Sequence, residues 1–254
     1  MLVIENTDVF GWESAVRGMR NPMNSWDQSD SNFSCKTCEG CVWEHDARVE
    51  TEETEDWIDT TSWCPHSPCR IGENDMKLMK NLAKAGSDHA KYLRMINVTM
   101  DVTAPLYWWK EFDTYKVGTV ANSCSTMHKI HAKPFTLDDF SHEHLISSCG
   151  KNGDSLEVLE SVIAAMNYWR ERFIVANKIQ EDVEGEFEHK KKMWWQMIQL
   201  LPSSYNQKRT VQLNYEVLRN QYRARKNHKL VEWHTYCDWI TTLPYAKELI
   251  IGEE

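Results

Sequence analysis

Proline and glycine are scarce in this chain, with 7 and 10 residues among 254. This scarcity argues against a turn-dense β-sandwich, which needs these residues at its many tight turns. No apolar run approaches the roughly 20 residues needed to span a bilayer. The segment from Met1 to Trp12 carries Glu5 and Asp8 and lacks the basic start and apolar middle of a secretory signal. We therefore expect a cytoplasmic protein with no membrane partner.

An excess of basic residues is also missing, because the formal net charge is −9. This charge leaves no electrostatic footprint for general nucleic-acid binding, although it is compatible with a local anion pocket. Hydrophobic residues make up 41% and charged residues 26%, which is the composition of a globular protein. Twelve tryptophans indicate large aromatic surfaces that are packed or presented.

Five of the eight cysteines fall in a loop-rich segment between residues 33 and 70. Two thiolates with two residues between them can bind one metal ion from a tight turn. A second pair further along the chain can then complete a tetrahedral metal site. In a reducing compartment this pattern favours a structural metal, zinc before an iron–sulfur cluster. Free thiols or a regulatory disulfide are the alternatives. The expected ligands are Cys35, Cys38, Cys64 and Cys69, with Cys41 and His66 in reserve.

Helical and strand patterns begin after this segment. A helix capped by Asn74 or Asp75 is expected, followed by a half-buried strand over Leu93–Val102 that ends at Ala104-Pro105. A short helix over Leu106–Phe112 and a polar loop with strand pieces over Val117–Ile130 should follow.

The remaining chain is expected to be mainly helical. Apolar residues recur at helical spacing from Ser155, and Gly185 with its charged neighbours should divide this region into two helices. Two more helices are expected over Val211–Tyr222 and Leu230–Leu243, whereas residues 1–32 carry few signals.

Two groups of polar residues are candidates for a site. The segment from Gly86 to Met127 offers hydroxyl and backbone donors to an anion, although charged residues after a turn are usually a solvated face. Asn214 and Arg225 are about three helical turns apart and share a face. With Asn220 they could read a planar heterocycle, the alternative being an ordinary polar helix surface.

The order of these pieces resembles the flavin-dependent thymidylate synthases over about residues 72–250. His89 lies where that family has a flavin-contacting His before a strand, and Ala104-Pro105 lies at the strand end. After Leu201-Pro202, the helix residues Asn214, Asn220 and Arg225 fall on the two family asparagines and the uracil-binding Arg.

This chain departs from the family at the phosphate end of the site. Thr114-Tyr115-Lys116 replaces the Arg-His-Arg triplet, and Ile198 stands where an Arg contacts the nucleotide phosphate. Glu111 replaces a Gln, Cys124 replaces a Ser, and its flanking acid and Arg become Asn122 and Thr126. Lys116 keeps one positive charge and Tyr115 keeps a planar ring.

We expect a single α+β domain over residues 1–254 that contains a Cys-rich insertion over residues 33–70 outside the region of resemblance. For the fold, the resemblance implies a central antiparallel sheet with long flanking helices. It implies a homotetramer with FAD, NADPH and methylenetetrahydrofolate, acting on a pyrimidine deoxynucleotide such as dUMP by reductive one-carbon transfer. The implied catalytic residue is Arg225. The implied cofactor-binding residues are His89, Tyr115, Lys116, Asn214 and Asn220, and the substrate-binding residues are Glu111, Asn122, Ser123, Cys124, Ser125 and Arg225.

Two other functions fit the same residues. The fold could serve as a nucleotide-binding protein that has lost the chemistry. Alternatively, the cysteine segment could be the active part, as a metal-stabilised interaction module.

Overall fold

A computed structural model of the chain describes residues 1–33, 70–148, 153–178 and 186–252. Within these residues, four antiparallel strands form one sheet in the order β1-β2-β4-β3. The strands are β1 (Val3–Phe10), β2 (Asn97–Pro105), β3 (Val120–Ser123) and β4 (Asn206–Asn214). The helices are α1 (Trp12–Arg20), α2 (Glu73–Lys84), α3 (Leu106–Phe112), α4 (Thr126–Lys129), α5 (Ser155–Lys178), α6 (Glu186–Leu200), α7 (Tyr215–Arg225) and α8 (Val231–Thr241).

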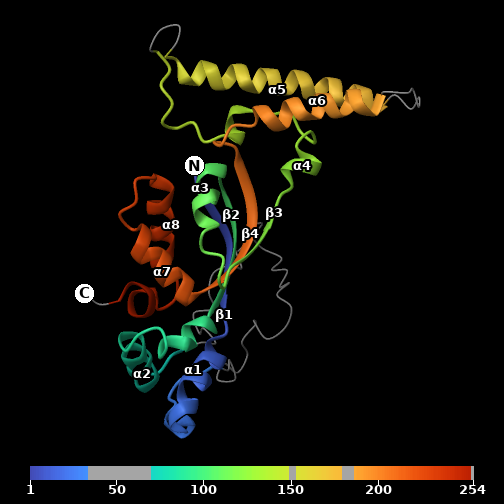
Figure 1. Cartoon of the computed structure of the whole chain (residues 1–254). Helices are drawn as coiled ribbons and strands as arrows, with labels where there is room; N and C mark the ends of the chain where they lie inside the picture. The colour runs from blue at the N-terminus through green and yellow to red at the C-terminus, as the bar shows by residue number, and fades with distance from the viewer. Residues whose placement is uncertain (34–69, 149–152, 179–185, 253–254) are drawn as a thin grey trace, which may run out of the picture.

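The helices are distributed unevenly around the sheet. Figure 1 shows α3, α7 and α8 together beside the sheet, with the α5–α6 pair across one end and α1 and α2 at the other. None of the described helices is both long and apolar enough to cross a membrane.

The main core lies between the sheet and α3, α7 and α8. Along β2 the residues alternate, so that Val98, Met100 and Val102 are buried while their neighbours are half-buried. The apolar face of β2 packs with Val211 and Leu213 of β4 and with the tryptophan-rich face of α3. This packing explains part of the tryptophan content, because three of the twelve tryptophans, Trp108, Trp109 and Trp233, are among the largest fully buried side chains.

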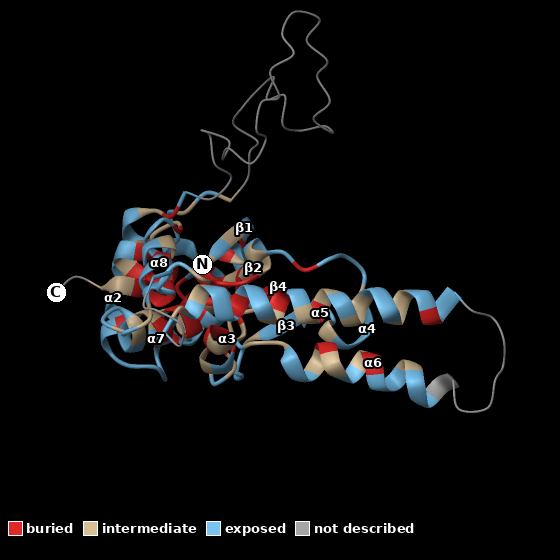
Figure 2. Cartoon of the chain, turned by 90° about the horizontal axis from the view of Figure 1, so that it is seen from above, coloured by how far each residue is buried: buried red, intermediate tan, exposed pale blue. Residues whose placement is uncertain are grey.

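A second apolar cluster holds the long helices to the end of the sheet. Met166 of α5 and Met197 of α6 are fully buried there against Phe135 and Phe140. Seen from above, α5 and α6 lie side by side and much of their surface is exposed (Figure 2).

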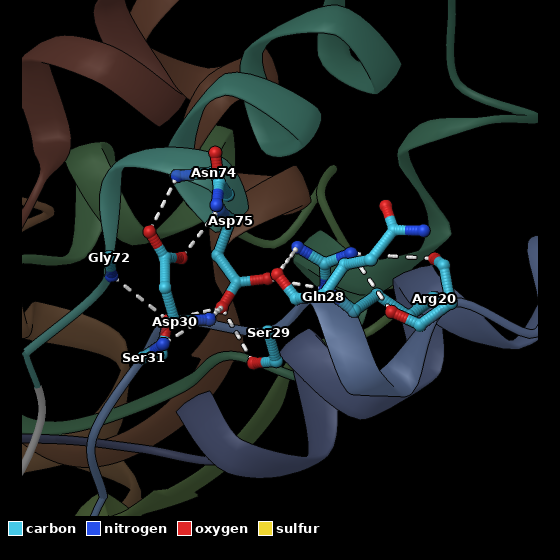
Figure 3. Close-up of polar contacts among 9 residues, drawn as sticks. Arg20, Gln28, Ser29, Asp30, Ser31, Gly72, Asn74 and Asp75 are labelled. Carbon is cyan, nitrogen blue, oxygen red and sulfur yellow. Dashed lines mark hydrogen bonds and ion pairs between the residues drawn. The ribbon is translucent and has the colours of Figure 1, made fainter.

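A buried ion pair joins α1 to α2. Arg20 Nε donates to Asp75 Oδ1 at 2.6 Å, and the two side chains are 3% and 0% exposed. The other carboxylate oxygen accepts hydrogen bonds from the hydroxyls of Ser29 and Ser31 at 2.7 and 2.6 Å (Figure 3). Burial alone would raise the pKa of Asp75, but the hydrogen bonds from Ser31, Ser29 and Arg20 outweigh it and lower the pKa.

Several predicted elements are confirmed. The α+β class with an antiparallel sheet and long helices is correct, and the short helix spans Leu106–Phe112 as expected. The expected break near Gly185 falls between the observed ends of α5 and α6. The Cys-rich insertion and its proposed metal ligands lie outside the described residues.

Three expectations were wrong in detail. Neither Asn74 nor Asp75 caps α2, because Asp75 is turned inward and the carboxylate of Asp30 accepts from the N–H groups of both residues, at 2.9 and 3.1 Å. The strand begins at Asn97 rather than Leu93, because Ala90–Arg94 form a 3₁₀ turn.

The third error concerns the helix expected from Val211. Residues up to Asn214 belong to β4, and the helix begins at Tyr215. Residues 1–32, which carry few sequence signals, also supply both β1 and α1.

Candidate functional site

An exposed edge of the α3–α7–α8 group carries an ion pair between two of the predicted residues. Glu111 lies at the rim of α3 because Trp108, Trp109 and Phe112 take the buried face. Arg225 ends α7, and its Nη1 donates to Glu111 Oε2 at 2.7 Å. The two side chains are 19% and 33% exposed for Arg225 and Glu111, so the pair is accessible from solvent.

Trp233 donates a hydrogen bond to the same carboxylate oxygen, and the His228 ring lies beside it. Trp233 Nε1 lies 3.1 Å from Glu111 Oε2, and His228 Nε2 lies 3.2 Å from it. The other ring nitrogen of His228, Nδ1, accepts from the Leu230 N–H at 3.1 Å. Because Nδ1 is an acceptor, the neutral ring carries its proton on Nε2, the nitrogen that lies near Glu111.

Aromatic rings hold the guanidinium of Arg225 in place. Its Cζ atom lies 4.9 Å from the Trp233 ring centroid and 5.6 Å from that of Tyr115. The Nε atom also donates to the Tyr115 hydroxyl at 2.9 Å. We call Glu111, Tyr115, Arg225, His228 and Trp233 the Arg225 cluster.

The loop that carries Tyr115 runs along α7. Gly118 has a φ of +78°, and a Cβ there would lie 2.9 Å from Asn214 Nδ2 and 3.2 Å from Val217 Cγ2. A side chain at this position would clash as well as strain the backbone. The loop therefore spans from the start of α7 at Asn214 to its end at Arg225, which places Tyr115 against the guanidinium.

A second charged group lies at the junction of α3 and β4. Arg209 donates to Asp113 Oδ1 at 2.8 Å and to Gln207 Oε1 at 3.0 Å, and its Cζ lies 4.1 Å above the Trp109 ring. The amide of Gln207 in turn donates to the Cys124 carbonyl at 2.8 Å. This arrangement ties the end of β3 to the same helix that carries Glu111.

The predicted substrate residues of β3 point in different directions. Asn122 pairs with Thr210 and Ser123 with Arg209, so successive side chains face opposite sides of the sheet. The Ser125 hydroxyl accepts from His128 N–H at 3.0 Å and caps α4. Asn122, Ser123, Cys124 and Ser125 are all exposed.

The predicted cofactor residues are also divided. Asn214 is buried, and its side-chain oxygen accepts from Val217 N–H at 3.1 Å as the cap of α7. His89, Lys116 and Asn220 are exposed, and no described residue forms an ion pair or hydrogen bond with their side chains.

This set fits a flavin. Lys116 offers a cation to a pyrophosphate, Tyr115 offers a ring, and His89 and Asn220 offer hydrogen bonds. Asn214 could contribute only through its amide nitrogen, because its side-chain oxygen already accepts the hydrogen bond that caps α7.

The structure thus brings together Glu111, Tyr115 and Arg225, three residues that the resemblance had named separately, and their roles stay predictions. His228, Trp233, Gln207 and Arg209 were missed. The only sequence signal for the first two was their position shortly after Arg225, and nothing in the sequence marked Gln207 and Arg209.

A nucleophilic role for the buried thiol near the cluster is not supported. Cys237 of α8 is buried, which raises the pKa of its thiol to about 11, so the thiol stays protonated near neutral pH. Among the described residues, no group of three or more His, Cys, Asp or Glu side chains is arranged to hold a metal ion.

The architecture is that of the flavin-dependent thymidylate synthases. Thymidylate synthase X from Helicobacter pylori, solved with FAD and dUMP, matches with a TM-score of 0.57 and 13% identity, covering 98% of this chain and 97% of that one. A second structure of the same enzyme complexed with FAD and dUMP gives a TM-score of 0.56 at 13% identity, with 97% of each chain covered.

A UMP/dUMP methylase from Streptomyces cacaoi, bound with 5-Br dUMP, has the same fold. It matches with a TM-score of 0.53 and 12% identity over 99% of this chain and 95% of that one. No protein-family model and no curated protein matches the sequence. The likeness therefore establishes the fold, while the activity has to be argued from the site.

Proposed function

We propose that this protein binds a pyrimidine deoxynucleotide at the Arg225 cluster and, with FAD, transfers a one-carbon unit reductively to the pyrimidine ring. The observation that carries this proposal is the Arg225 guanidinium itself. Contacts with Trp233, Tyr115 and Glu111 fix the orientation of this planar group, which remains partly exposed to solvent. A fixed planar donor suits the carbonyl edge of a pyrimidine, and the compared structures that share the fold contain dUMP or 5-Br dUMP.

Arg225 is the catalytic residue in this proposal. Its guanidinium would hold the pyrimidine carbonyl and stabilise the negative charge that develops there as the ring is attacked. Glu111, Asn122, Ser123, Cys124 and Ser125 would position the nucleotide, although the exposed β3 residues lie apart from the cluster.

The cofactor would lie against a second set of side chains. His89, Tyr115, Lys116, Asn214 and Asn220 would hold FAD, which supplies hydride transfer when bound. NADPH and methylenetetrahydrofolate are the proposed co-substrates. The exposed side chains of His89, Lys116 and Asn220 leave this face accessible to a large ligand.

An absorbance spectrum of the purified protein is the first test. Flavin bands that bleach when NADPH is added without oxygen, together with dUMP binding by calorimetry, would support the proposal. A protein that takes up no flavin when incubated with FAD would overturn the reductive chemistry.

A second function is favoured by how the two arginines are engaged. Arg225 is paired with Glu111 and Arg209 with Asp113, so both arginines are already partly neutralised. A nucleotide-binding protein without the chemistry would tolerate this arrangement, whereas strong phosphate binding would not be expected. Nucleotide binding by a colourless protein that rejects FAD would favour this function.

A further inference from the structure

We propose that the Arg225 cluster selects a cytosine nucleotide over a uracil nucleotide. This inference rests on the proposed function, since it specifies the pyrimidine that the site binds. It depends on which hydrogen-bonding atoms of Glu111 and Arg225 are already used and which are left for a ligand.

The carboxylate of Glu111 offers one free oxygen. Its Oε2 atom accepts from Arg225 Nη1 and Trp233 Nε1 at 2.7 and 3.1 Å, and His228 Nε2 lies 3.2 Å from it. No described residue donates to Oε1. Because Arg225 and Trp233 both donate to Oε2, the carboxylate cannot rotate without breaking both hydrogen bonds, so Oε1 stays a fixed acceptor.

The guanidinium of Arg225 also has donors that no described residue uses. Its Nε–H is used by Tyr115 and one Nη1–H by Glu111. Both Nη2–H groups and the second Nη1–H have no acceptor among the described residues. In this proposal, a ligand that contacts both side chains meets two adjacent donors of Arg225 followed by the Glu111 acceptor.

This order matches cytosine better than uracil. The pairing edge of cytosine presents O2 and N3 as acceptors and the N4 amino group as a donor, so all three positions can be satisfied. Carboxylates accept from the cytosine N4 amino group in nucleic-acid recognition for the same reason. Uracil presents an acceptor, a donor and an acceptor, so at most two positions match and one carbonyl remains unpaired beside a carboxylate that has nothing to donate.

The test compares three nucleotides on the intact protein by calorimetry, with and without FAD. The nucleotides are dCMP, dUMP and the deoxynucleotide of pyrimidin-2-one, which keeps the two acceptors of cytosine but lacks the amino group. We expect dCMP to bind at least tenfold more tightly than either of the others, about 1.4 kcal/mol. This comparison needs no variant, so it does not depend on whether a mutant folds.

A variant then tests whether Glu111 causes the preference for dCMP over dUMP. Glu111→Gln supplies an amide donor beside the acceptor, so the advantage of dCMP over dUMP should shrink to less than threefold or reverse. Glu13→Gln, at an exposed position on α1, is the matched control and should keep the wild-type ratio. Thermal unfolding of both variants checks that the fold is retained.

The outcomes separate the two proposals. Equal or tighter binding of dUMP in the wild type, or a pyrimidin-2-one nucleotide as tight as dCMP, overturns the cytosine preference and leaves nucleotide binding intact. Failure of all three nucleotides to bind at millimolar concentration overturns nucleotide binding itself.

Discussion

Arg225 makes contacts that a lysine cannot reproduce. Its fork donates to Glu111 and Tyr115 at once and lies over the Trp233 ring. In Arg225→Lys the charge remains but the planar geometry is lost, so nucleotide affinity should fall at least tenfold, about 1.4 kcal/mol. Arg223→Lys, two residues away on an exposed face, should bind normally. Unchanged binding by Arg225→Lys in calorimetry would remove this residue from the site.

The buried environment of Asp75 also leads to a specific prediction about stability. Removing its charge in Asp75→Asn leaves the buried Arg20 without its ion-pair partner, which should lower the free energy of unfolding by about 3 kcal/mol. The exposed Asp8→Asn is the control and should change it little. Because the native pKa of Asp75 is lowered, its stabilisation is complete above the unfolded pKa of about 3.9 and fades as the pH falls below it.

Urea unfolding measured across the acid range tests both parts. The variant should be less stable than the wild type near neutral pH, and the difference should narrow below about pH 4, where the unfolded carboxyl becomes protonated. A difference that stays constant down to low pH would show that packing, rather than the charge of Asp75, accounts for its effect.

Some individual residues of the candidate site could be predicted from the sequence. Glu111, Tyr115 and Arg225 were identified because each falls at a position that a family motif marks. His228 and Trp233 were missed because they reach Glu111 only when α8, and the connection from α7 that carries His228, lie against α3, which no local pattern encodes. Arg209 was missed for the same reason, since only the pairing of β4 brings it to Asp113.

Among the elements, β4 shows why local patterns mislead. Val211, Tyr215, Leu218 and Tyr222 keep helical spacing, so the sequence predicted one helix where a strand passes directly into α7. Most other residues of β4 are polar, and the strand forms because β2 and β3 supply hydrogen-bonding partners on both sides. The helices of the α5–α6 pair were predictable because their apolar stripes are long and uninterrupted by proline.

The two ends of the cysteine segment meet at a fixed point of the fold. Asn32 and Arg70 exchange two backbone hydrogen bonds, at 2.9 and 3.0 Å, and the adjoining Ser31 hydroxyl accepts from Gly72 N–H at 3.0 Å. These contacts do not need the intervening chain. Replacing residues 34–69 with a short glycine-containing turn should therefore leave the thermal unfolding temperature within a few degrees of the wild type.

Elemental analysis of the same two proteins tests the metal prediction. The full chain should carry one metal ion, zinc being the first candidate, held by Cys35, Cys38, Cys64 and Cys69, and the shortened chain should carry none. A shortened protein that no longer folds would show that the segment is required for stability, and a full chain without metal would overturn the ligand assignment.

At the scale of the whole molecule, the ion pairs of Arg209 and Arg225 predict that the protein retains flavin only weakly. Lys116, which follows Tyr115 in the chain, is exposed, whereas Arg209 and Arg225 are both paired with carboxylates. Flavin added to the purified protein should be lost on gel filtration and restored by adding FAD. Stoichiometric flavin after prolonged dialysis would contradict this expectation.

The surface near the site also predicts self-association. Val117 is 90% exposed and Val120 is 69% exposed, on the loop and strand that follow Tyr115. Exposed apolar side chains next to a site are typical of surfaces that another chain covers. Light scattering should give a mass four times that of the 29.9 kDa chain, and Val120→Glu should shift it toward smaller species. A wild-type monomer at micromolar concentration would exclude the proposed homotetramer.

The mutual contacts of the Arg225 cluster have a thermodynamic consequence. Glu111, Tyr115, Arg225, His228 and Trp233 restrain one another before any ligand arrives, so their side-chain entropy is lost during folding rather than on binding. Immobilising a side chain on binding costs about 0.5–1.5 kcal/mol, and a preformed site avoids much of this cost. A nucleotide should therefore bind here with a favourable enthalpy and only a small entropic penalty from the protein.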